Sequence, residues 1–206
     1  SRGKIVRGFN PDVFDSSIIN SPNHLRIDGK DFIIVQLENG ELKILDRRGK
    51  DRIKIDEKIQ FSKNRIFSYL KTFTTTDNQG NLIQIDMDGK LSKKNLNLSI
   101  DNLIDIKNDN LVYLSENNLS IKGINVELPF GRYSRPKIFN ESGNMLIGIT
   151  NLDESNIYLY KDNGELLDGF PLKGNSIIDV KNSDKDDKTE VLTTLDKYSI
   201  VSYEIN

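Results

Sequence analysis

The chain repeats itself at an interval of about 40 residues, and this period constrains its fold more than any other feature. Segment 41–50 (ELKILDRRGK) aligns without a gap with segment 81–90 (NLIQIDMDGK). The identical positions are the pairs Leu42 and Leu82, Asp46 and Asp86, Gly49 and Gly89, and Lys50 and Lys90. A third copy (NIYLYKDNGE) occupies 156–165. A period of this length indicates one supersecondary unit that is repeated and stacked along the chain.

Further matches bring the number of copies to five. Segment 118–123 is a shortened copy, and segment 199–204 is a last copy that stops before its turn. A longer-range match counts the units independently, because segment 3–9 resembles segment 164–170 at an offset of 161 residues. That offset is close to four periods, which is what five successive units require.

The local pattern within each unit predicts β-strands. Short runs rich in β-branched, leucine and aromatic residues are bounded by Asn, Asp and Gly. These runs lie at 32–37, 42–45, 82–85, 111–114, 145–149 and 157–160. Tight hairpins need glycine where φ is positive, and the turns contain Gly40, Gly80, Gly89 and Gly164. Neighbouring strands are therefore predicted to be antiparallel, with a fourth strand from the run before each unit, such as Ile18-Ile19 or Ile177-Ile178.

These patterns predict an all-β fold. Four strands in each repeat of about 40 residues favour a β-propeller of about five four-stranded antiparallel blades, or a part of a larger propeller. Solenoids are less suitable, because their repeats are usually shorter or helical. The expected blades of the single domain 1–206 are 16–55, 56–97, 98–131, 132–172 and 173–206, with 3–10 as a closing strand.

The two ends of the chain bear on how such a ring would close. Segment 1–4 has no initiator Met and reads like the middle of a turn, so we expect the chain to be the C-terminal part of a longer protein. Segment 4–7 is expected to pair antiparallel with 200–203, because an open strand edge exposes unpaired backbone groups. The alternative is a partial ring whose open edge is covered by another copy of the chain.

The order of features within a unit resembles known propeller repeats. A hydrophobic run, a glycine turn, the run 42–46, a second glycine turn and then Gly-Phe-Pro, as at 169–172, resemble the PQQ-type and FG-GAP-type repeats of bacterial envelope proteins. The chain is also similar to the C-terminal repeat region of large Bacteroidetes envelope proteins. The resemblance implies a location in the cell envelope or periplasm. The tryptophan that often docks PQQ-type blades is missing, and cofactor binding is not carried over.

Composition narrows the range of partners. The 29 Lys and Arg nearly cancel the 31 Asp and Glu, which leaves a formal charge of -2 and predicts no basic field that would attract nucleic acid or an anionic membrane. No run of 18 or more apolar residues is present, so no direct membrane insertion by this segment is expected. The absence of cysteine excludes disulfides, thiolate metal sites and a cysteine nucleophile.

Few residues are candidates for site chemistry. The single histidine, His24, cannot form a usual catalytic triad or zinc site, and we expect it to have a structural or surface role. One weak candidate calcium loop carries oxygen ligands at alternate positions: Asn182, Asp184, Asp186 and Glu190. Asp187 replaces the glycine that the sharp turn of such loops needs, and lysines are interleaved. We therefore expect no metal or cofactor to be required for folding, with calcium as the one possibility.

Other conspicuous residues receive structural assignments. Asp46 and Asp86 occupy matching turn positions and are interpreted as hydrogen-bond acceptors. Threonines at 74–76 and 193–194 are attributed to strand propensity. Several aromatic residues could line a sugar or peptide surface, but core packing is the favoured use of Tyr133, Tyr158, Tyr160 and Phe170.

These observations predict a binding or scaffolding domain that is not an enzyme, with a protein or glycan partner. One alternative is a carbohydrate-active or other hydrolytic propeller, because 31 acidic residues guarantee that some pair lies close together. Another is a partial ring with no function of its own. In an enzyme, ionisable side chains with shifted pKa values should gather in a central funnel, whereas in a scaffold they should not.

Overall fold

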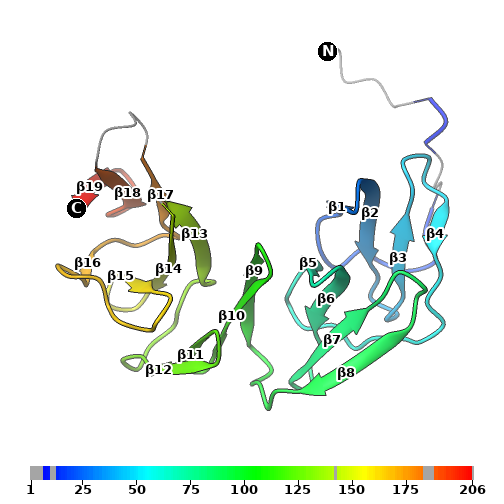
Figure 1. Ribbon diagram of the computed structural model, residues 1–206, viewed down its shortest axis with the longest axis horizontal. Coiled ribbons are helices and arrows are strands. Elements are labelled where there is room, and N and C mark those ends of the chain that lie inside the picture. The colour runs from blue at the N-terminus through cyan, green and yellow to red at the C-terminus, as the bar shows by residue number, and fades with distance from the viewer. Residues whose placement is uncertain (1–6, 10–12, 142, 183–187, 206) are drawn as a thin grey trace. The chain divides into compact units, whose positions relative to one another are not determined.

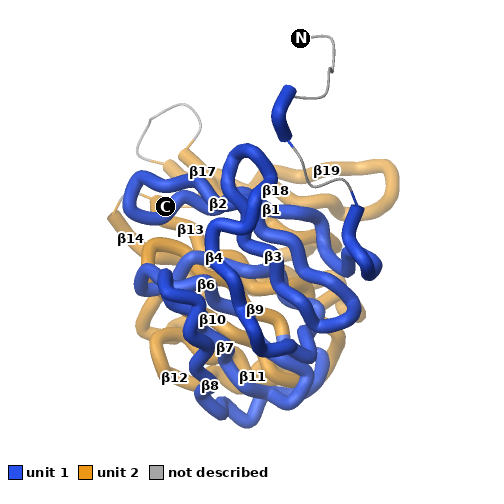
Figure 2. Tube along the Cα trace, turned by 90° about the vertical axis from the view of Figure 1, so that its right-hand side faces the viewer, with its two compact units in different colours: residues 1–102 blue, residues 103–206 orange. Residues whose placement is uncertain are grey.

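The computed structural model describes residues 7–9, 13–141, 143–182 and 188–205. The regular structure in these ranges is β-strand throughout, nineteen strands in five antiparallel sheets, and no helix occurs in them (Figure 1). Most of the expected closing strand 3–10, with its pairing to 200–203, lies outside the described residues. The chain divides into two compact units, 1–102 and 103–206, which are coloured separately in Figure 2.

Unit 1 contains two four-stranded sheets in which consecutive strands are hydrogen-bonded neighbours. The first sheet consists of β1 (Asn23–Ile27), β2 (Lys30–Gln36), β3 (Leu42–Leu45) and β4 (Asp51–Ile53). The second consists of β5 (Phe67–Tyr69), β6 (Thr72–Thr76), β7 (Asn81–Ile85) and β8 (Leu91–Asn95). One core lies between these two sheets, where the Phe32 and Phe73 rings meet edge to face with centroids 5.0 Å apart.

Unit 2 contains the remaining three sheets. The third consists of β9 (Leu103–Lys107), β10 (Asn110–Ser115), β11 (Asn118–Ile121) and β12 (Ile124–Glu127). The fourth consists of β13 (Lys137–Glu141), β14 (Asn144–Asn151), β15 (Asn156–Lys161) and β16 (Leu172–Lys173). In the fifth, the described strands are β17 (Asp179–Lys181), β18 (Thr189–Thr194) and β19 (Ile200–Ile205). Alternate residues of the fourth sheet enter two different cores, one with the third sheet and one with the fifth.

The predicted strands are present, with one correction at the start of each unit. Runs 42–45, 82–85 and 157–160 lie in β3, β7 and β15. Ile18, however, forms only an isolated bridge with Leu37, and the first strand is β1. Its sequence NHLRI was overlooked because polar residues occupy its exposed positions, while the more apolar pair Ile18-Ile19 precedes it. Ile177 and Ile178 likewise come just before β17.

The turn glycines are required both by their positive φ and by the lack of room for a Cβ atom. Gly89 has φ of 84°, and an added Cβ would overlap the carbonyl oxygen of Lys54, which follows the outer strand of the first sheet. Gly80 has φ of 82° and would meet the Leu98 backbone in the same way. The turn aspartates act as the sequence predicted, because Oδ1 of Asp46 accepts the backbone N–H groups of Arg48 and Lys50. These glycines therefore form turns and also let the next segment approach.

Side chains at the ends of second strands hydrogen-bond to the connecting segment that follows their own sheet. Gln36 Nε2 donates to the Asn64 carbonyl oxygen at 3.1 Å, and Thr76 Oγ1 donates to Asn102 Oδ1 at 2.8 Å. In unit 2, Thr150 Oγ1 donates to the Ser176 carbonyl oxygen at 2.6 Å. Strand propensity alone therefore does not account for every threonine, since Thr76 and Thr150 bind the segment that enters the following sheet.

Candidate functional site

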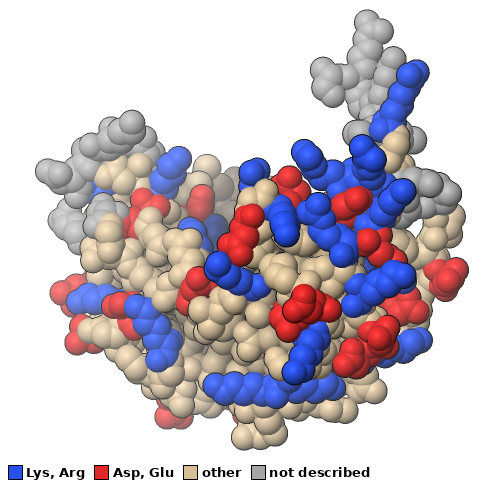
Figure 3. Space-filling model, turned by 45° about the vertical axis from the view of Figure 1, so that its right-hand side comes forward, with Lys and Arg blue, Asp and Glu red and all other residues tan. Residues whose placement is uncertain are grey.

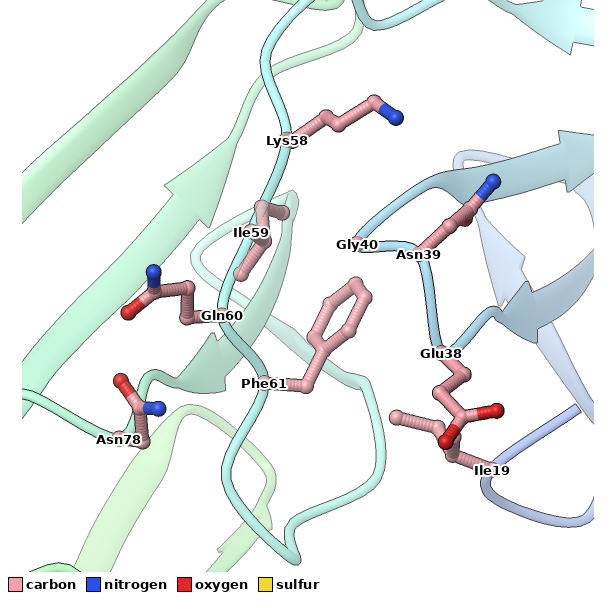
Figure 4. A pocket seen from close by; sticks show the side chains of 9 residues that line it. All are labelled: Ile19, Glu38, Asn39, Gly40, Lys58, Ile59, Gln60, Phe61 and Asn78. Atoms are coloured by element: carbon pink, nitrogen blue, oxygen red, sulfur yellow. The ribbon is translucent and has the colours of Figure 1, made fainter. Parts of the chain in front are cut away.

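A groove of about 580 Å³ opens at one end of the first two sheets, within unit 1 (Figure 4). It lies where the turn between β2 and β3 meets the connection that leads toward the second sheet. Its walls come from four separate segments: Ile19, Glu38, Asn39, Gly40, Lys58, Ile59, Gln60, Phe61 and Asn78. No side chain of a single strand dominates the groove, so its shape depends on how the loops are held.

Backbone hydrogen bonds hold the two long walls together. The Ile59 N–H donates to the Gly40 carbonyl oxygen at 2.8 Å. Gly40 has φ of 86°, and an added Cβ would lie 3.0 Å from the Ile59 oxygen, so this approach depends on glycine. The turn itself is braced by the Asn39 side chain, whose Oδ1 accepts the Glu41 N–H at 3.1 Å. The groove is thus supported by fixed backbone rather than by loose loops.

Two apolar side chains form the floor. Figure 4 shows the Phe61 ring pointing toward Gly40 in the space between the walls, and the Ile19 side chain pointing from the other side toward Phe61. Phe61 is half-buried, packs against the core of unit 1 and bridges to Asp77, so its ring is held in place. Ile19 is 41% exposed, and its N–H donates to the Gln36 carbonyl oxygen at 3.1 Å. A ligand in the groove would meet a fixed aromatic surface beside an accessible aliphatic one.

Amides and charges of both signs form the rim. The amide groups of Asn39, Gln60 and Asn78 each offer donors and an acceptor. The Asn78 N–H donates to the Gln60 carbonyl oxygen at 2.8 Å, which places these two amides beside each other. Figure 4 shows the Asn78 side chain directed toward Gln60. Glu38 and Lys58 add one negative and one positive charge, so the rim suits a ligand that itself carries donors, acceptors or both charges.

Carboxyl groups with lowered pKa values lie at separate turns. A hydrogen bond from Lys43 lowers the pKa of Glu41 beside the groove, and backbone N–H groups of Lys50 and Arg48 lower the pKa of Asp46. In unit 2, hydrogen bonds from the backbone and guanidinium of Arg132 lower the pKa of Asp153. Each of these carboxyls is stabilised as the charged form, which suits a structural acceptor and does not suit a general acid.

The sequence-predicted candidate residues do not come together in the groove. His24 is 59% exposed and its Nε2 lies 3.0 Å from Asp31 Oδ1. Of the calcium candidates, Asp184 and Asp186 lie outside the described residues, and Glu190 lies in β18 opposite Lys181 and Glu204. Within the described ranges, no three His, Asp or Glu side chains are grouped so as to hold a metal ion.

The aromatic residues considered for a ligand surface lie in the cores of unit 2. Tyr133, Tyr158 and Tyr160 are all less than one-tenth exposed, and Phe170 packs in the core between the fourth and fifth sheets. Burial raises the pKa of Tyr133 and of Tyr160 to about 12. Tyr133 also donates its hydroxyl to the Pro129 carbonyl oxygen at 2.6 Å. Core packing, the favoured interpretation from sequence, is confirmed.

Sequence reasoning missed the groove because its residues carry no shared motif. Asn39 and Gly40 were assigned to a turn, which is correct, but a turn assignment does not say what packs beside it. Phe61 was the one available signal, since it is a large aromatic residue in a polar connection between repeats. Even that signal required knowing that 58–61 passes beside the turn of the preceding sheet.

Comparisons with known proteins identify the fold of the chain and do not identify an activity. No protein-family model and no curated protein sequence matches the chain. Among solved structures, it is similar to streptogramin B lyase, with a TM-score of 0.58 and 16% identity over 96% of this chain and 72% of that chain. It is also similar to BBS1N, solved in complex with ARL6DN, with a TM-score of 0.61 and 14% identity over 93% of this chain and 66% of that chain.

A third similar structure is Hsv2 of Kluyveromyces lactis, with a TM-score of 0.60 and 18% identity over 86% of this chain and 59% of that chain. The chain thus spans between 59% and 72% of these three proteins. All three have the β-propeller fold. This chain has the β-propeller fold as well, and its sheets are propeller blades. Because the described residues contain no helix, they provide no helical membrane span.

Proposed function

We propose that this chain is a non-catalytic binding domain, and that the groove of unit 1 holds an extended segment of a protein partner. The observation that carries the proposal is the groove itself, in which an apolar floor lies between two backbone-braced walls with a rim of amides. Binding sites for small segments are concave, largely preformed and apolar, with a few polar groups that set orientation.

The chemistry of the lining fits a peptide. An extended peptide presents backbone N–H and C=O groups at regular intervals, and side-chain amides can pair with both kinds. Its side chains would pack on the Phe61 ring and on Ile19. Glu38 and Lys58 would complement a peptide that carries charges of both signs.

The composition of the lining also supports a role without catalysis. Glu38 is the single carboxylate among the residues that line the groove. Glycoside hydrolysis by the usual mechanisms requires two carboxyl groups about 5 to 10 Å apart, one as acid and one as base or nucleophile. The groove can therefore bind and orient a chain, and its own lining supplies no such pair.

A glycan is the second candidate ligand. One aromatic ring flanked by amide side chains is also a suitable surface for a sugar, whose C–H face packs on the ring while its hydroxyls bond the amides. We further propose a cell-envelope location, which rests on the resemblance of the repeats to those of envelope proteins. Fractionation of cells that produce the protein, followed by immunodetection, tests the location.

The binding proposal is tested with labelled protein on a peptide array and on a glycan array. We expect saturable binding to a subset of peptides. The variant Ile19→Arg places a long charged side chain in the groove, and it should weaken binding at least tenfold. Ile18→Arg is the matched control, because Ile18 is adjacent and 47% exposed but does not line the groove.

Three results would contradict the proposal. Equal loss of binding in both variants would indicate a general effect of the added charge. Binding that Ile19→Arg leaves unchanged would place the ligand elsewhere. Hydrolysis of the captured peptides or glycans by the wild-type protein would show that the domain is an enzyme.

A further inference from the structure

A basic cluster lies at the opposite end of the first sheet from the groove. The turns between β1 and β2 and between β3 and β4 both lie at this end, because neighbouring strands are antiparallel. Segments 26–31 and 46–52 together contain six Lys or Arg and four Asp. Figure 3 shows Lys and Arg side chains gathered over this part of unit 1. The two ends of the sheet therefore present different chemistry.

The cluster converges on one carboxylate. Asp31 is only 18% exposed, and its oxygens lie 3.0 Å from His24 Nε2, 3.9 Å from Arg26 Nη1 and 3.9 Å from Arg47 Nε. Arg26 is the direct cross-strand partner of Asp31, and His24 lies two residues earlier on the same strand face. The sheet register thus brings these groups together, with Arg47 added from the turn.

A third guanidinium is fixed beside the same residue. Arg52 Nη1 donates to the backbone oxygen of Asp31 at 2.9 Å, and the guanidinium carbon lies 5.2 Å from the centre of the Phe32 ring. A cation over an aromatic face is attracted by the ring quadrupole. Arg52 is therefore held in place by contacts that leave its positive charge without a neutralising carboxylate in those contacts.

The site has excess positive charge and N–H donors with which it could bind a ligand. The guanidinium groups of Arg26 and Arg47 lie near the Asp31 carboxylate, and that of Arg52 binds the backbone oxygen of the same residue. Three positive charges thus lie around one carboxylate residue, an excess of two. At 3.9 Å the contacts of Arg26 and Arg47 are too long to be hydrogen bonds, so their N–H donors remain available. Their side chains are 68% and 82% exposed.

Other carboxylates of these turns are partly engaged. Asp28 pairs with Lys71 at 3.2 Å. Asp46 accepts the backbone N–H groups of its own turn, and its charge also acts on Arg48 and Arg52. With six Lys or Arg against four Asp, the two turns together still keep an excess of two positive charges. An excess of two charges with forked donors matches a divalent tetrahedral oxyanion better than a single carboxylate.

We propose that His24, Arg26, Arg47 and Arg52 form a binding site for a divalent tetrahedral oxyanion, the phosphate or sulfate group of a ligand. The site is independent of the groove, since the two lie at opposite ends of the first sheet. Asp31 orients the cations and offsets their mutual repulsion in the absence of the anion.

The chain contains one histidine, which makes the test specific. The imidazole C–H resonances of His24 report on this site alone. We expect them to shift saturably when inorganic phosphate or sulfate is added at constant pH, with a dissociation constant below about 10 mM. The tighter of the two anions identifies the ligand group. Sodium chloride at matched ionic strength is the control for screening, and it should move the resonances little.

The paired variant Arg26→Ala/Arg47→Ala should weaken binding at least tenfold. The matched variant Lys93→Ala/Lys94→Ala removes the same charge from exposed positions of β8 in unit 1, and it should change the affinity less than twofold. Circular dichroism and thermal melting would verify that both variants fold. Equal weakening in the two variants, equal shifts with chloride, or no shift with either anion would each overturn the proposal.

Discussion

The two units share one building plan and differ in charge. Residues 1–102 carry 18 Lys and Arg against 14 Asp and Glu, a formal charge of +4. Residues 103–206 carry 11 against 17, a formal charge of -6. The near-neutral total of the chain is thus the sum of two opposite halves. A whole-chain charge therefore does not describe the surface of either unit, and the inference that no basic field exists holds only for the total.

The buried polar groups of the two units also differ. In unit 1 the fully buried Asn64 amide bonds to Ser62, Thr76 and Asn102, with donor–acceptor distances of 2.8 to 3.2 Å. In unit 2 the cited junction bond comes from one hydroxyl, that of Thr150, and the core packs stacked tyrosines, with Tyr158 and Tyr160 centroids 6.3 Å apart. The junction of unit 1 thus combines a central amide with hydroxyls, whereas that of Thr150 in unit 2 relies on a hydroxyl alone.

The largest effect is expected where a glycine of unit 1 is replaced. Gly89→Ala would force a Cβ into the Lys54 carbonyl oxygen at a φ of 84°, and it should destabilise unit 1 by more than about 3 kcal/mol. Gly123→Ala in unit 2 has a similar φ of 85° but open space, and about 1 kcal/mol is expected. Urea unfolding followed by hydrogen exchange of each unit measures both. Equal losses would mean that φ alone, and not the close approach, requires glycine at Gly89.

A smaller effect is expected from the junction residues. Asn64→Ala leaves several buried partners without their donor and should cost about 2 to 4 kcal/mol in unit 1. Thr150→Val removes the 2.6 Å hydrogen bond to the Ser176 oxygen in unit 2 and should cost about 1 to 2 kcal/mol. Hydrogen exchange at β6 and β14 would show which unit is loosened. A larger loss of stability for Thr150→Val than for Asn64→Ala would show that the amide network of unit 1 is not the stronger junction.

The smallest effect appears only at high pH. Burial raises the pKa of Tyr160 to about 12 from the usual value of 10.0, with smaller contributions from Tyr158 and Tyr133. The folded pKa is above the unfolded one, so the stabilisation is complete below pH 10 and is lost as the pH rises toward 12. Tyr160→Phe cannot ionise, and its alkaline unfolding midpoint should rise by less than about one pH unit.

Tyr69→Phe is the matched control, because Tyr69 is a half-buried tyrosine of β5 in unit 1. This variant should leave the alkaline midpoint of unit 2 unchanged. Far-ultraviolet circular dichroism from pH 9 to 12.5 records the transition. An unchanged midpoint for Tyr160→Phe would show that ionisation of this tyrosine does not drive unfolding.

Several features of the fold could be predicted from local pattern. The turn glycines need positive φ wherever the chain reverses, and the runs at 42–45 and 82–85 form strands because their residues suit a pleated, half-buried surface. The first strand of each sheet was harder to predict. β1 carries His24 and Arg26 at exposed positions, and such polar alternation is a weak signal beside the apolar pair Ile18-Ile19.

The sequence by itself determined the antiparallel hairpins, because these depend on neighbours within a few residues of each other. It also determined the period and the propeller class, because the same short pattern recurs along the chain. Only the tertiary structure decided the sites. Ile19, Gly40 and Phe61 line one groove, although up to 42 positions separate them. Asp31 meets Arg47 and Arg52 because strand pairing sets the register across a sheet. The local propensity of a residue does not report on contacts with residues far away in the sequence, and only the packing of the sheets brings these residues together.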